Sequence, residues 1–461
     1  MDSLEYKLDD PGEVTQNIKN EKSQRKFIII IVLLILIITV FVALFIIELI
    51  RAKNLSDDKD DLQKKNDYLR KEILNNNISL DAGSDMLLFS FGKRLSNISY
   101  AEDNVIINSF VKNGNNYIEE LGEINNGKNY PKNERNVYDL YIPSSAKEKK
   151  DKYNKIILFI HGGAWVAGEK DQMELFCTTY GSLGFITATM GYTILMNNYD
   201  QANIFRMIDE ITATIKSIKK ELINAGFNGD KLEMAISGGS AGGHLSLLYA
   251  YGFGKNSAIP IKYIINICGP VTLEDYYYIQ LKNMDDTLDN IDSKSIKKAR
   301  QEGKVIPISQ IWTGESFESS KKFLAMLLNV FLGRNPTEDF DQLYDDKNNT
   351  IIYSKKYYEI FKKINYSLPV MYINENSIPT LNIYGGRDDI AGIGQYAYLE
   401  DNFVKYKNSN FTLVYSRYAP HTPFEIASEN GIEKIKEMNY QILEYAAKYF
   451  TKNWIKNFIN S

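Results

Sequence analysis

One serine stands in a sequence context that could make it a nucleophile. Ser240 lies at the centre of 238–242 (Gly-Gly-Ser-Ala-Gly), with glycines two residues before and two residues after it. At a sharp strand-to-helix turn, side chains at those two positions would collide, so glycine fits there. The flanks agree, because 231–237 alternates like a strand and 241–251 predicts a buried helix. The N-terminus of that helix would direct free N–H groups toward the serine.

A second loop could stabilise negative charge near this serine. The apolar run 155–160 predicts a central parallel strand, and it is followed by His-Gly-Gly-Ala-Trp at 161–165. Small residues in such a loop let backbone N–H groups approach a substrate oxygen. We therefore expect an oxyanion hole formed by the N–H groups of Gly163, Ala164 and Ala241.

An acidic pair and a histidine follow two later strands. The predicted strand 379–384 runs into Gly-Gly-Arg-Asp-Asp at 385–389, and the predicted strand 411–416 is followed by Ala-Pro-His-Thr-Pro at 419–423. The order along the chain is oxyanion loop, serine, aspartate and histidine. This is the order found in the α/β-hydrolase fold.

Together these motifs resemble the esterase/lipase branch of the α/β-hydrolase superfamily, which includes hormone-sensitive-lipase-like and feruloyl-esterase-like carboxylesterases. The resemblance runs from Asn136 to the C-terminus. It implies a mostly parallel central sheet flanked by helices, and a structural role for His161 in the oxyanion loop. The chain departs from the family pattern at Ala164, Thr193 and Gly239, where glycine, arginine and an acidic residue are frequent.

The serine needs a base, and the base needs a group that orients it. His244 lies one turn into the predicted helix and should point into the scaffold, whereas His421 lies on a loop after the last predicted strand. His421 is therefore the candidate base. Asp388 is the preferred acid because it lies three residues after Gly385, as in the family motif, and Asp389 is the alternative.

Three functions are compatible with these residues. The first is a serine carboxylesterase that cleaves short-acyl esters through an acyl-enzyme and needs no cofactor. The second is a serine peptidase or amidase of the same fold, which the family resemblance alone does not exclude. The third is a non-catalytic adhesion or scaffold protein with a hydrolase-like domain, against which the intact serine, histidine, aspartate and oxyanion loop argue.

Strands and helices alternate through the presumed catalytic domain, 136–461. This pattern predicts a parallel sheet with helices on both faces and an active site at the carboxyl ends of the strands. Predicted strands are 155–160, 185–190, 231–237, 262–268, 379–384 and 411–416, and predicted helices are 172–183, 202–224, 241–252, 394–407 and 432–450.

The stretch 272–375 interrupts this alternation. It lacks strand signals, carries many charges and contains an amphipathic piece around 323–331, so we expect a helical cap over the site. Tyr276 of this insertion and Trp165 of the oxyanion loop are candidate substrate contacts.

The N-terminal part predicts a membrane anchor. Residues 1–26 are polar, which predicts a flexible tail. The segment 27–49 begins with an uncharged apolar run that would be about 30 Å long as a helix, enough to span a bilayer. The run is longer than the apolar core of a signal peptide, and no Ala-x-Ala cleavage site follows it. We therefore expect an uncleaved signal anchor. Basic residues are equally frequent on both sides and do not set the orientation. The short tail and large C-terminal part favour a catalytic domain outside the cytoplasm.

Residues 50–135 predict a charged stem and N-terminal extension. Leu55, Leu62 and Leu69 are spaced by seven, but charged residues occupy the other seam positions of a coiled coil. We expect a solvated helical stem, with weak dimerisation through it left open.

Overall composition points away from several other functions. The 461 residues include 54 basic and 58 acidic side chains, a balance that gives no reason to expect nucleic acid binding. No Cys/His spacing indicates a metal site, and no phosphate-binding loop is present. Cys177 and Cys268, the two cysteines, are expected to be buried thiols.

Overall fold

A computed structural model describes residues 93–101, 105–106, 130–147, 150–151, 154–182, 184–195, 202–274, 276–283, 286, 288, 292–307, 330–331, 344–345, 350–352, 354–417 and 419–421. All of them belong to 88–461, the second of the two units into which the chain divides. The predicted tail 1–26, anchor 27–49 and helix 432–450 lie outside the described residues, as does much of 50–135. Among the helices that the structure does describe, none combines the length and apolarity needed to cross a membrane.

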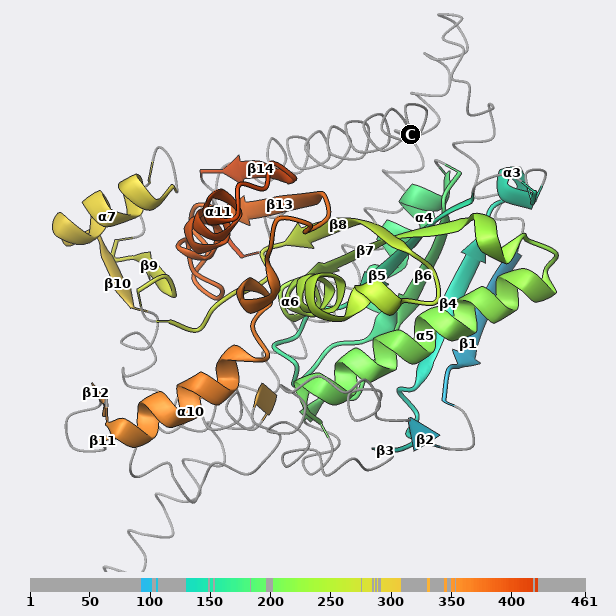
Figure 1. Ribbon diagram of the computed structural model, residues 1–461, viewed down its shortest axis with the longest axis horizontal. Helices are drawn as coiled ribbons and strands as arrows, with labels where there is room; N and C mark the ends of the chain where they lie inside the picture. The colour runs from blue at the N-terminus through green and yellow to red at the C-terminus, as the bar shows by residue number, and fades with distance from the viewer. Residues whose placement is uncertain are drawn as a thin grey trace, which may run out of the picture. The chain divides into compact units, whose positions relative to one another are not determined.

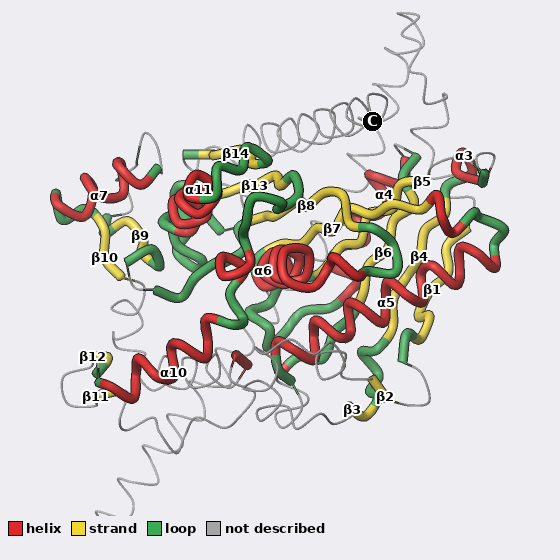
Figure 2. Tube along the Cα trace, viewed as in Figure 1, coloured by secondary structure: helices red, strands yellow, loops and turns green. Residues whose placement is uncertain are grey.

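In the described part of the chain, eight strands form one sheet of order β1-β4-β6-β5-β7-β8-β13-β14 (Figures 1 and 2). The pairs from β6 to β14 are parallel, whereas β4 pairs antiparallel with β6 and β1 antiparallel with β4. The strands are β1 (Lys93–Ser99), β4 (Val137–Ile142), β5 (Asn154–Ile160), β6 (Ile186–Met190), β7 (Leu232–Gly239), β8 (Ile261–Ile267), β13 (Thr380–Gly385) and β14 (Phe411–Ser416).

Helices cover both faces of this sheet. They are α3 (Ser144–Lys147), α4 (Glu174–Ser182), α5 (Ile204–Asn224), α6 (Ala241–Leu248), which continues as a π-helical turn over Tyr249–Phe253, and α11 (Gln395–Lys405). Helices α5 and α6 lie on one face and α4 on the other (Figure 1). The predicted mostly parallel sheet with flanking helices is therefore confirmed.

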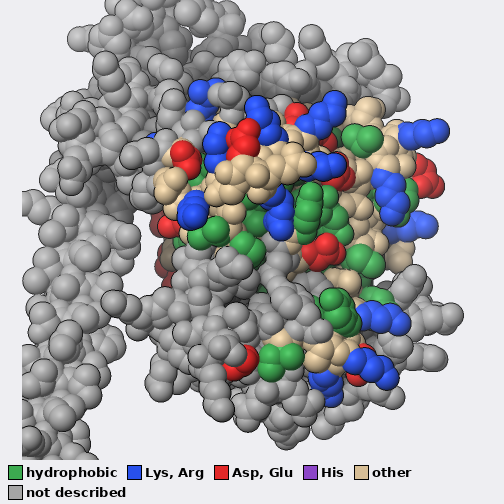
Figure 3. Space-filling model, turned by 90° about the vertical axis from the view of Figure 1, so that its left-hand side faces the viewer, with side chains coloured by type: hydrophobic (Ala, Val, Ile, Leu, Met, Phe, Trp, Pro, Cys, Tyr) green, Lys and Arg blue, Asp and Glu red, His purple; other side chains and the backbone are tan. Residues whose placement is uncertain are grey.

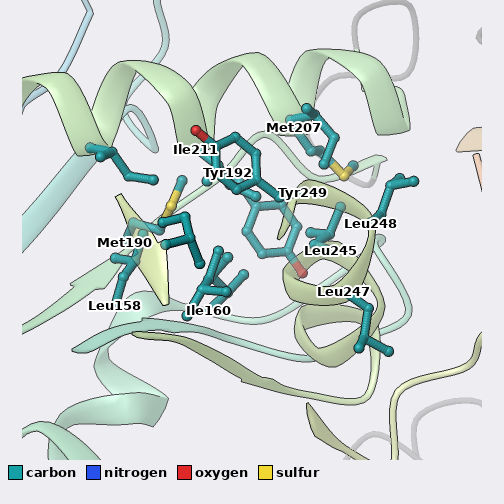
Figure 4. Close-up of a cluster of buried hydrophobic side chains, with 14 of the residues drawn as sticks. Leu158, Ile160, Met190, Tyr192, Met207, Ile211, Leu245, Leu247, Leu248 and Tyr249 are labelled. Atoms are coloured by element: carbon teal, nitrogen blue, oxygen red, sulfur yellow. The ribbon is translucent and has the colours of Figure 1, made fainter. Parts of the chain in front are cut away.

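Burial on both faces explains why the central strands are uninterrupted apolar runs. Along β5, Leu158 and Ile160 point toward α5 and α6, whereas Ile157 and Phe159 point toward α4. Figure 4 shows the first of these clusters, in which Leu158 and Ile160 gather with side chains of α5 and α6. Strands β5 and β7 pair with each other in parallel, so the loops that follow them leave the sheet at the same end.

The sheet begins earlier in the chain than Asn136, the predicted start of the domain. Strand β1, within the predicted extension 50–135, forms the edge of the sheet by pairing with β4. Its side chains are mostly exposed, so its sequence lacks the alternating apolar pattern of a half-buried strand. Short strands β2 (Val105–Ile106) and β3 (Tyr130–Pro131) also pair in this region.

The insertion 272–375 contains strands as well as helices, which corrects the prediction of a purely helical cap. Its described elements are β9 (Ile279–Leu281), α7 (Ser293–Gln301), β10 (Val305–Pro307), β11 (Tyr344–Asp345), β12 (Thr350–Ile351) and α10 (Lys355–Asn365). The strands pair antiparallel as β9 with β10 and β11 with β12. Helix α7 buries Ile296 and Ala299. On this side of the molecule, Lys and Arg side chains lie among hydrophobic and acidic side chains on the described surface (Figure 3).

Candidate active site

Ser240 occupies a strained turn between β7 and α6. Its φ of 54° and ψ of −122° lie in a region that costs a residue with a side chain about 1–3 kcal/mol. The turn requires glycine on both sides, since a Cβ on Gly238 would lie 2.3 Å from the carbonyl carbon of Gly242. A Cβ on Gly242 would lie 2.0 Å from the carbonyl oxygen of Ile160. The serine is held in this conformation by its N–H, which donates to the carbonyl of Ile267 at 2.8 Å.

Three side chains from distant parts of the chain form a continuous hydrogen-bonded row. His421 Nε2 lies 2.7 Å from Ser240 Oγ, and His421 Nδ1 lies 2.9 and 3.0 Å from the two carboxylate oxygens of Asp388. Each residue lies at or just beyond the carboxyl end of a parallel strand, which is why they meet at one edge of the sheet. The structure thus brings together the three residues that the sequence nominated.

The two candidate acids occupy different environments. Asp388 is buried, and its Oδ1 accepts hydrogen bonds from the backbone N–H groups of Ile390 and Ala391 at 2.9 and 2.8 Å. Asp389 is exposed to solvent. The backbone donors hold Oδ1 of the carboxylate beside His421, an arrangement in which Asp388 can orient the imidazole.

The electrostatics of His421 favour its protonated form. Burial alone lowers the pKa of the imidazole, but the charge of Asp388, the hydrogen bond to it and the charge of Asp389 outweigh burial and raise that pKa above its ordinary value of 6.5. A base with a raised pKa holds a proton more strongly once it has received it. The row can therefore accept the proton of the Ser240 hydroxyl and stabilise the resulting imidazolium.

The loop after β5 presents backbone donors toward the same edge. Gly163, Ala164 and Trp165 all have positive φ, at 107°, 51° and 62°. The carbonyl of Gly163 turns back to accept from the N–H groups of Val166 and Ala167. Among the bonds between described residues, none uses the N–H of Gly163, Ala164 or Ala241. These are the three predicted oxyanion donors, and the third is the first N–H of α6.

Supporting contacts that sequence reasoning missed hold this loop from behind. Arg135 donates through Nε to the carbonyl of Tyr192 at 2.9 Å and through Nη2 to the carbonyl of Gly168. The Tyr192 hydroxyl donates to the carbonyl of His161 at 3.0 Å, and the two rings stack at 4.1 Å. Burial lowers the pKa of His161 to about 4, which keeps this ring neutral. No local pattern in the sequence marks Arg135.

The two candidate substrate contacts occupy very different places. The Trp165 side chain is buried, with 4% of its surface exposed, and packs against His244 and Phe331. Tyr276 is 42% exposed, and the guanidinium of Arg300 lies over its ring at 4.4 Å. Contact of either side chain with a substrate remains a prediction.

One group of potential metal ligands overlaps the site. Within the described residues, Cys268, Asp388 and His421 place one ligand atom each within 4.8 Å of one another. The carboxylate and the imidazole already bond to each other, and the Cys268 thiol donates to the carbonyl of Ile383 at 3.5 Å. Burial raises the pKa of this thiol well above its ordinary value. The arrangement is that of an acid–base pair beside a buried thiol. Cys177 is also a free, buried thiol, as predicted.

Comparison with known proteins identifies the family. The family model described as BD-FAE matches residues 138–403, which is more than half of the chain. The chain belongs to the BD-FAE family. This match confirms the resemblance to the esterase branch of the α/β-hydrolase superfamily, and the matched range includes the oxyanion loop, Ser240 and Asp388.

Individual relatives of this BD-FAE protein match shorter stretches. Isoprenylcysteine alpha-carbonyl methylesterase ICME of Arabidopsis thaliana is 29% identical over 112 residues, 24% of each chain. The Oryza sativa subsp. japonica protein named "Probable isoprenylcysteine alpha-carbonyl methylesterase ICME" is 32% identical over 112 residues, 24% of this chain and 25% of its own. The match thus spans about a quarter of the length of these curated relatives.

Two solved structures are also similar to this chain at low sequence identity. Esterase B from Lactobacillus Rhamnosis (HN001) is 14% identical with a TM-score of 0.44, and the likeness covers 80% of this chain and 89% of that one. A truncated carbohydrate esterase from gut microbiota is 16% identical with a TM-score of 0.43, covering 77% and 97% of the two chains.

Proposed function

We propose that this protein is a serine esterase that hydrolyses small carboxylic esters through an acyl-enzyme. The observation that carries the proposal is the row Ser240–His421–Asp388, with 2.7 Å between hydroxyl and imidazole. Membership of the BD-FAE family and the names of the methylesterase relatives support ester bonds as the target.

In this proposal each group has a distinct role. Ser240 Oγ attacks the ester carbonyl while His421 Nε2 takes its proton, and Asp388 holds the Nδ1–H tautomer that leaves Nε2 free to accept. The oxyanion receives hydrogen bonds from the backbone N–H groups of Gly163, Ala164 and Ala241, each contributing about 3 kcal/mol in the transition state. His421 then protonates the leaving alcohol, and water attacks the acyl-enzyme by the reverse sequence.

A panel of substrates on the full-length chain tests this function. It contains p-nitrophenyl esters of increasing acyl length, peptide p-nitroanilides as the amide arm, and the methyl ester of a prenylated cysteine, which the relatives' names suggest. We expect ester turnover, a preference for short acyl chains and little amide cleavage. Faster turnover of the amides would favour the peptidase alternative. Absence of both turnover and fluorophosphonate labelling would overturn the esterase proposal.

Membrane anchoring is a separate prediction, carried by the uncharged run within 27–49. Full-length protein is expected to stay in the membrane fraction after carbonate extraction, whereas deletion of 27–49 should release it. A charge-reversal variant in the tail 1–26 serves as the matched control and should stay membrane-bound. Recovery of the full-length chain in the soluble fraction would refute the anchor.

The raised pKa of His421 predicts the pH dependence of hydrolysis. His421 must be neutral to accept a proton, so activity is present above its pKa and is lost as pH falls through it. The midpoint of the acid limb of kcat/KM is therefore expected above 6.5. Since the charge of Asp389 contributes to this shift, Asp389→Asn should move the midpoint to lower pH. A midpoint below 6.5 in the wild type contradicts the assignment of His421 as the base.

A further inference from the structure

The oxyanion loop keeps a backbone conformation that its own residues disfavour. Ala164 and Trp165 have φ of 51° and 62°, although neither is a glycine. Such conformations persist only where surrounding contacts over-determine them. The backbone of the loop is bonded through Gly163 and through the carbonyl of Trp165, which accepts from Leu195 at 3.1 Å. The Trp165 indole adds a side-chain contact from within the strained segment itself.

A buried histidine receives this indole. Trp165 Nε1 donates to His244 Nδ1 at 3.2 Å, and the two rings meet edge to face. On its other side, His244 Nε2 lies 2.8 Å from the carbonyl oxygen of Ser367. His244 is fully buried in α6, one turn after Ser240.

These two bonds determine the tautomer of His244. A carbonyl oxygen only accepts, so Nε2 must carry the proton that goes to Ser367. Nδ1 is then the acceptor for the indole N–H. Burial lowers the pKa of His244 to about 3, against the opposing effect of the bond to Ser367, so the ring stays neutral at any pH at which the protein works. The relay therefore has one fixed direction, from Trp165 through His244 to Ser367.

The relay connects three parts of the site. Trp165 belongs to the oxyanion loop, His244 to the helix that begins at the nucleophile, and Ser367 to the insertion 272–375. The ring of Phe331, also from the insertion, packs edge to face on Trp165 at 4.8 Å and contacts His244 at 5.5 Å. All four residues are buried, so solvent does not compete for these contacts.

We propose that His244 is a positioning residue that holds the oxyanion donors Gly163 and Ala164 in place by accepting the indole N–H of Trp165. The inference rests on the proposed esterase function. It gives the insertion a role in the site, because the Ser367 carbonyl fixes the tautomer of His244 on which the contact depends.

Three substitutions at two positions test the relay with little change in packing. Trp165→Phe keeps an aromatic ring against His244 and Phe331 but removes the donor. His244→Gln retains one donor and one acceptor, whereas His244→Leu retains neither. Tyr249→Phe is the matched control, since it removes a buried hydroxyl of the turn following α6 that bonds to Ser257 and not to the loop. Thermal unfolding of each full-length variant establishes that it is folded.

We expect these substitutions to weaken stabilisation of the transition state while substrate binding stays unchanged. Removing an oxyanion donor outright costs about 10²–10³ in kcat, so its displacement in Trp165→Phe and His244→Leu should lower kcat by about 10–100-fold. Affinity for a trifluoromethyl ketone, whose adduct carries the oxyanion, should fall in proportion. KM and the acid-limb midpoint should stay as in the wild type. His244→Gln should recover most of kcat, and Tyr249→Phe should match the wild type.

Three outcomes overturn the inference. Wild-type kcat and ketone affinity in folded Trp165→Phe would mean that the indole N–H does not position the loop. A rise in KM with unchanged kcat would make Trp165 a substrate contact instead. If folded His244→Gln were as slow as His244→Leu, the hydrogen bonds of His244 would not be what positions the loop. Failure of the wild type to turn over esters or bind the ketone is a different result, because it sinks the proposed function and the inference with it.

Discussion

Replacing Ser240 with alanine is expected to lower kcat for ester hydrolysis by about 10⁶-fold, the scale of nucleophile removal in a serine hydrolase. His421 Nε2 then faces a methyl group and has no hydroxyl to deprotonate. The backbone donors of Gly163, Ala164 and Ala241 remain, so residual hydrolysis above the rate in water should persist. The measurement is kcat on a p-nitrophenyl ester, together with labelling by a fluorophosphonate probe.

A second serine of the same helix provides the control. Ser246 is buried in α6 and its hydroxyl donates to the carbonyl of Gly242 at 2.7 Å, whereas the imidazole of His421 bonds to Ser240 and Asp388. Ser246→Ala should retain both turnover and labelling. Because Ser240 has φ of 54°, its replacement also tests stability, and thermal unfolding must show that the variant is folded. Turnover near the wild-type rate in a folded Ser240→Ala variant would assign the chemistry to another residue.

The central elements could be predicted from sequence because burial on two faces leaves a continuous signal. The predicted strands 155–160 and 379–384 correspond to Asn154–Ile160 and Thr380–Gly385. The helix predicted over 202–224 is observed over Ile204–Asn224, with Asn203 capping it by accepting from the N–H of Arg206. Along β5 the buried residues form a continuous apolar run, and in the second half of α5 they recur with helical spacing at Ile211, Ile215, Ile218 and Leu222.

Elements with little buried surface gave no such signal. Strand β1 is held by its backbone pairing with β4 while most of its side chains face solvent. The two- and three-residue strands of the insertion are too short to show a period of two. Their pairing depends on segments brought together by the rest of the fold, as when Val305 meets Leu281.

The candidate site likewise has features that the sequence predicts and features that it does not. The order of oxyanion loop, serine, aspartate and histidine is a property of the chain, and it nominated the residues that the sheet brings together. Contacts between residues far apart in the sequence cannot be recognised from the chain in this way. Trp165 meets His244 over 79 positions and His244 meets Ser367 over 123, and no spacing rule relates them. Even so, the place of His244 one turn into the helix correctly predicted that its ring points into the scaffold.

Asp388→Asn is expected to lower kcat by about 10⁴-fold, because it reverses the tautomer of His421. The backbone N–H groups of Ile390 and Ala391 both donate to Oδ1 of Asp388, so an asparagine must keep its carbonyl oxygen there. Its NH₂ group then takes the position of Oδ2, the nearer of the two oxygens to His421 Nδ1, at 2.9 Å against 3.0 Å for Oδ1. Nδ1 becomes an acceptor and the proton moves to Nε2, where it faces Ser240 Oγ and blocks proton transfer.

Asp389→Asn is the matched control, since it makes the same chemical change at the exposed neighbour. Asp389 influences His421 through its charge alone, so its loss should shift the pH profile and change kcat at its plateau by less than about 10-fold. Comparing kcat of the two variants at the plateau of the pH profile separates the effect of the His421 tautomer from the effect of the Asp389 charge. If Asp389→Asn were slower than Asp388→Asn, the orienting role would belong to Asp389. The two backbone hydrogen bonds to Asp388 would then shape the loop and would not support the base.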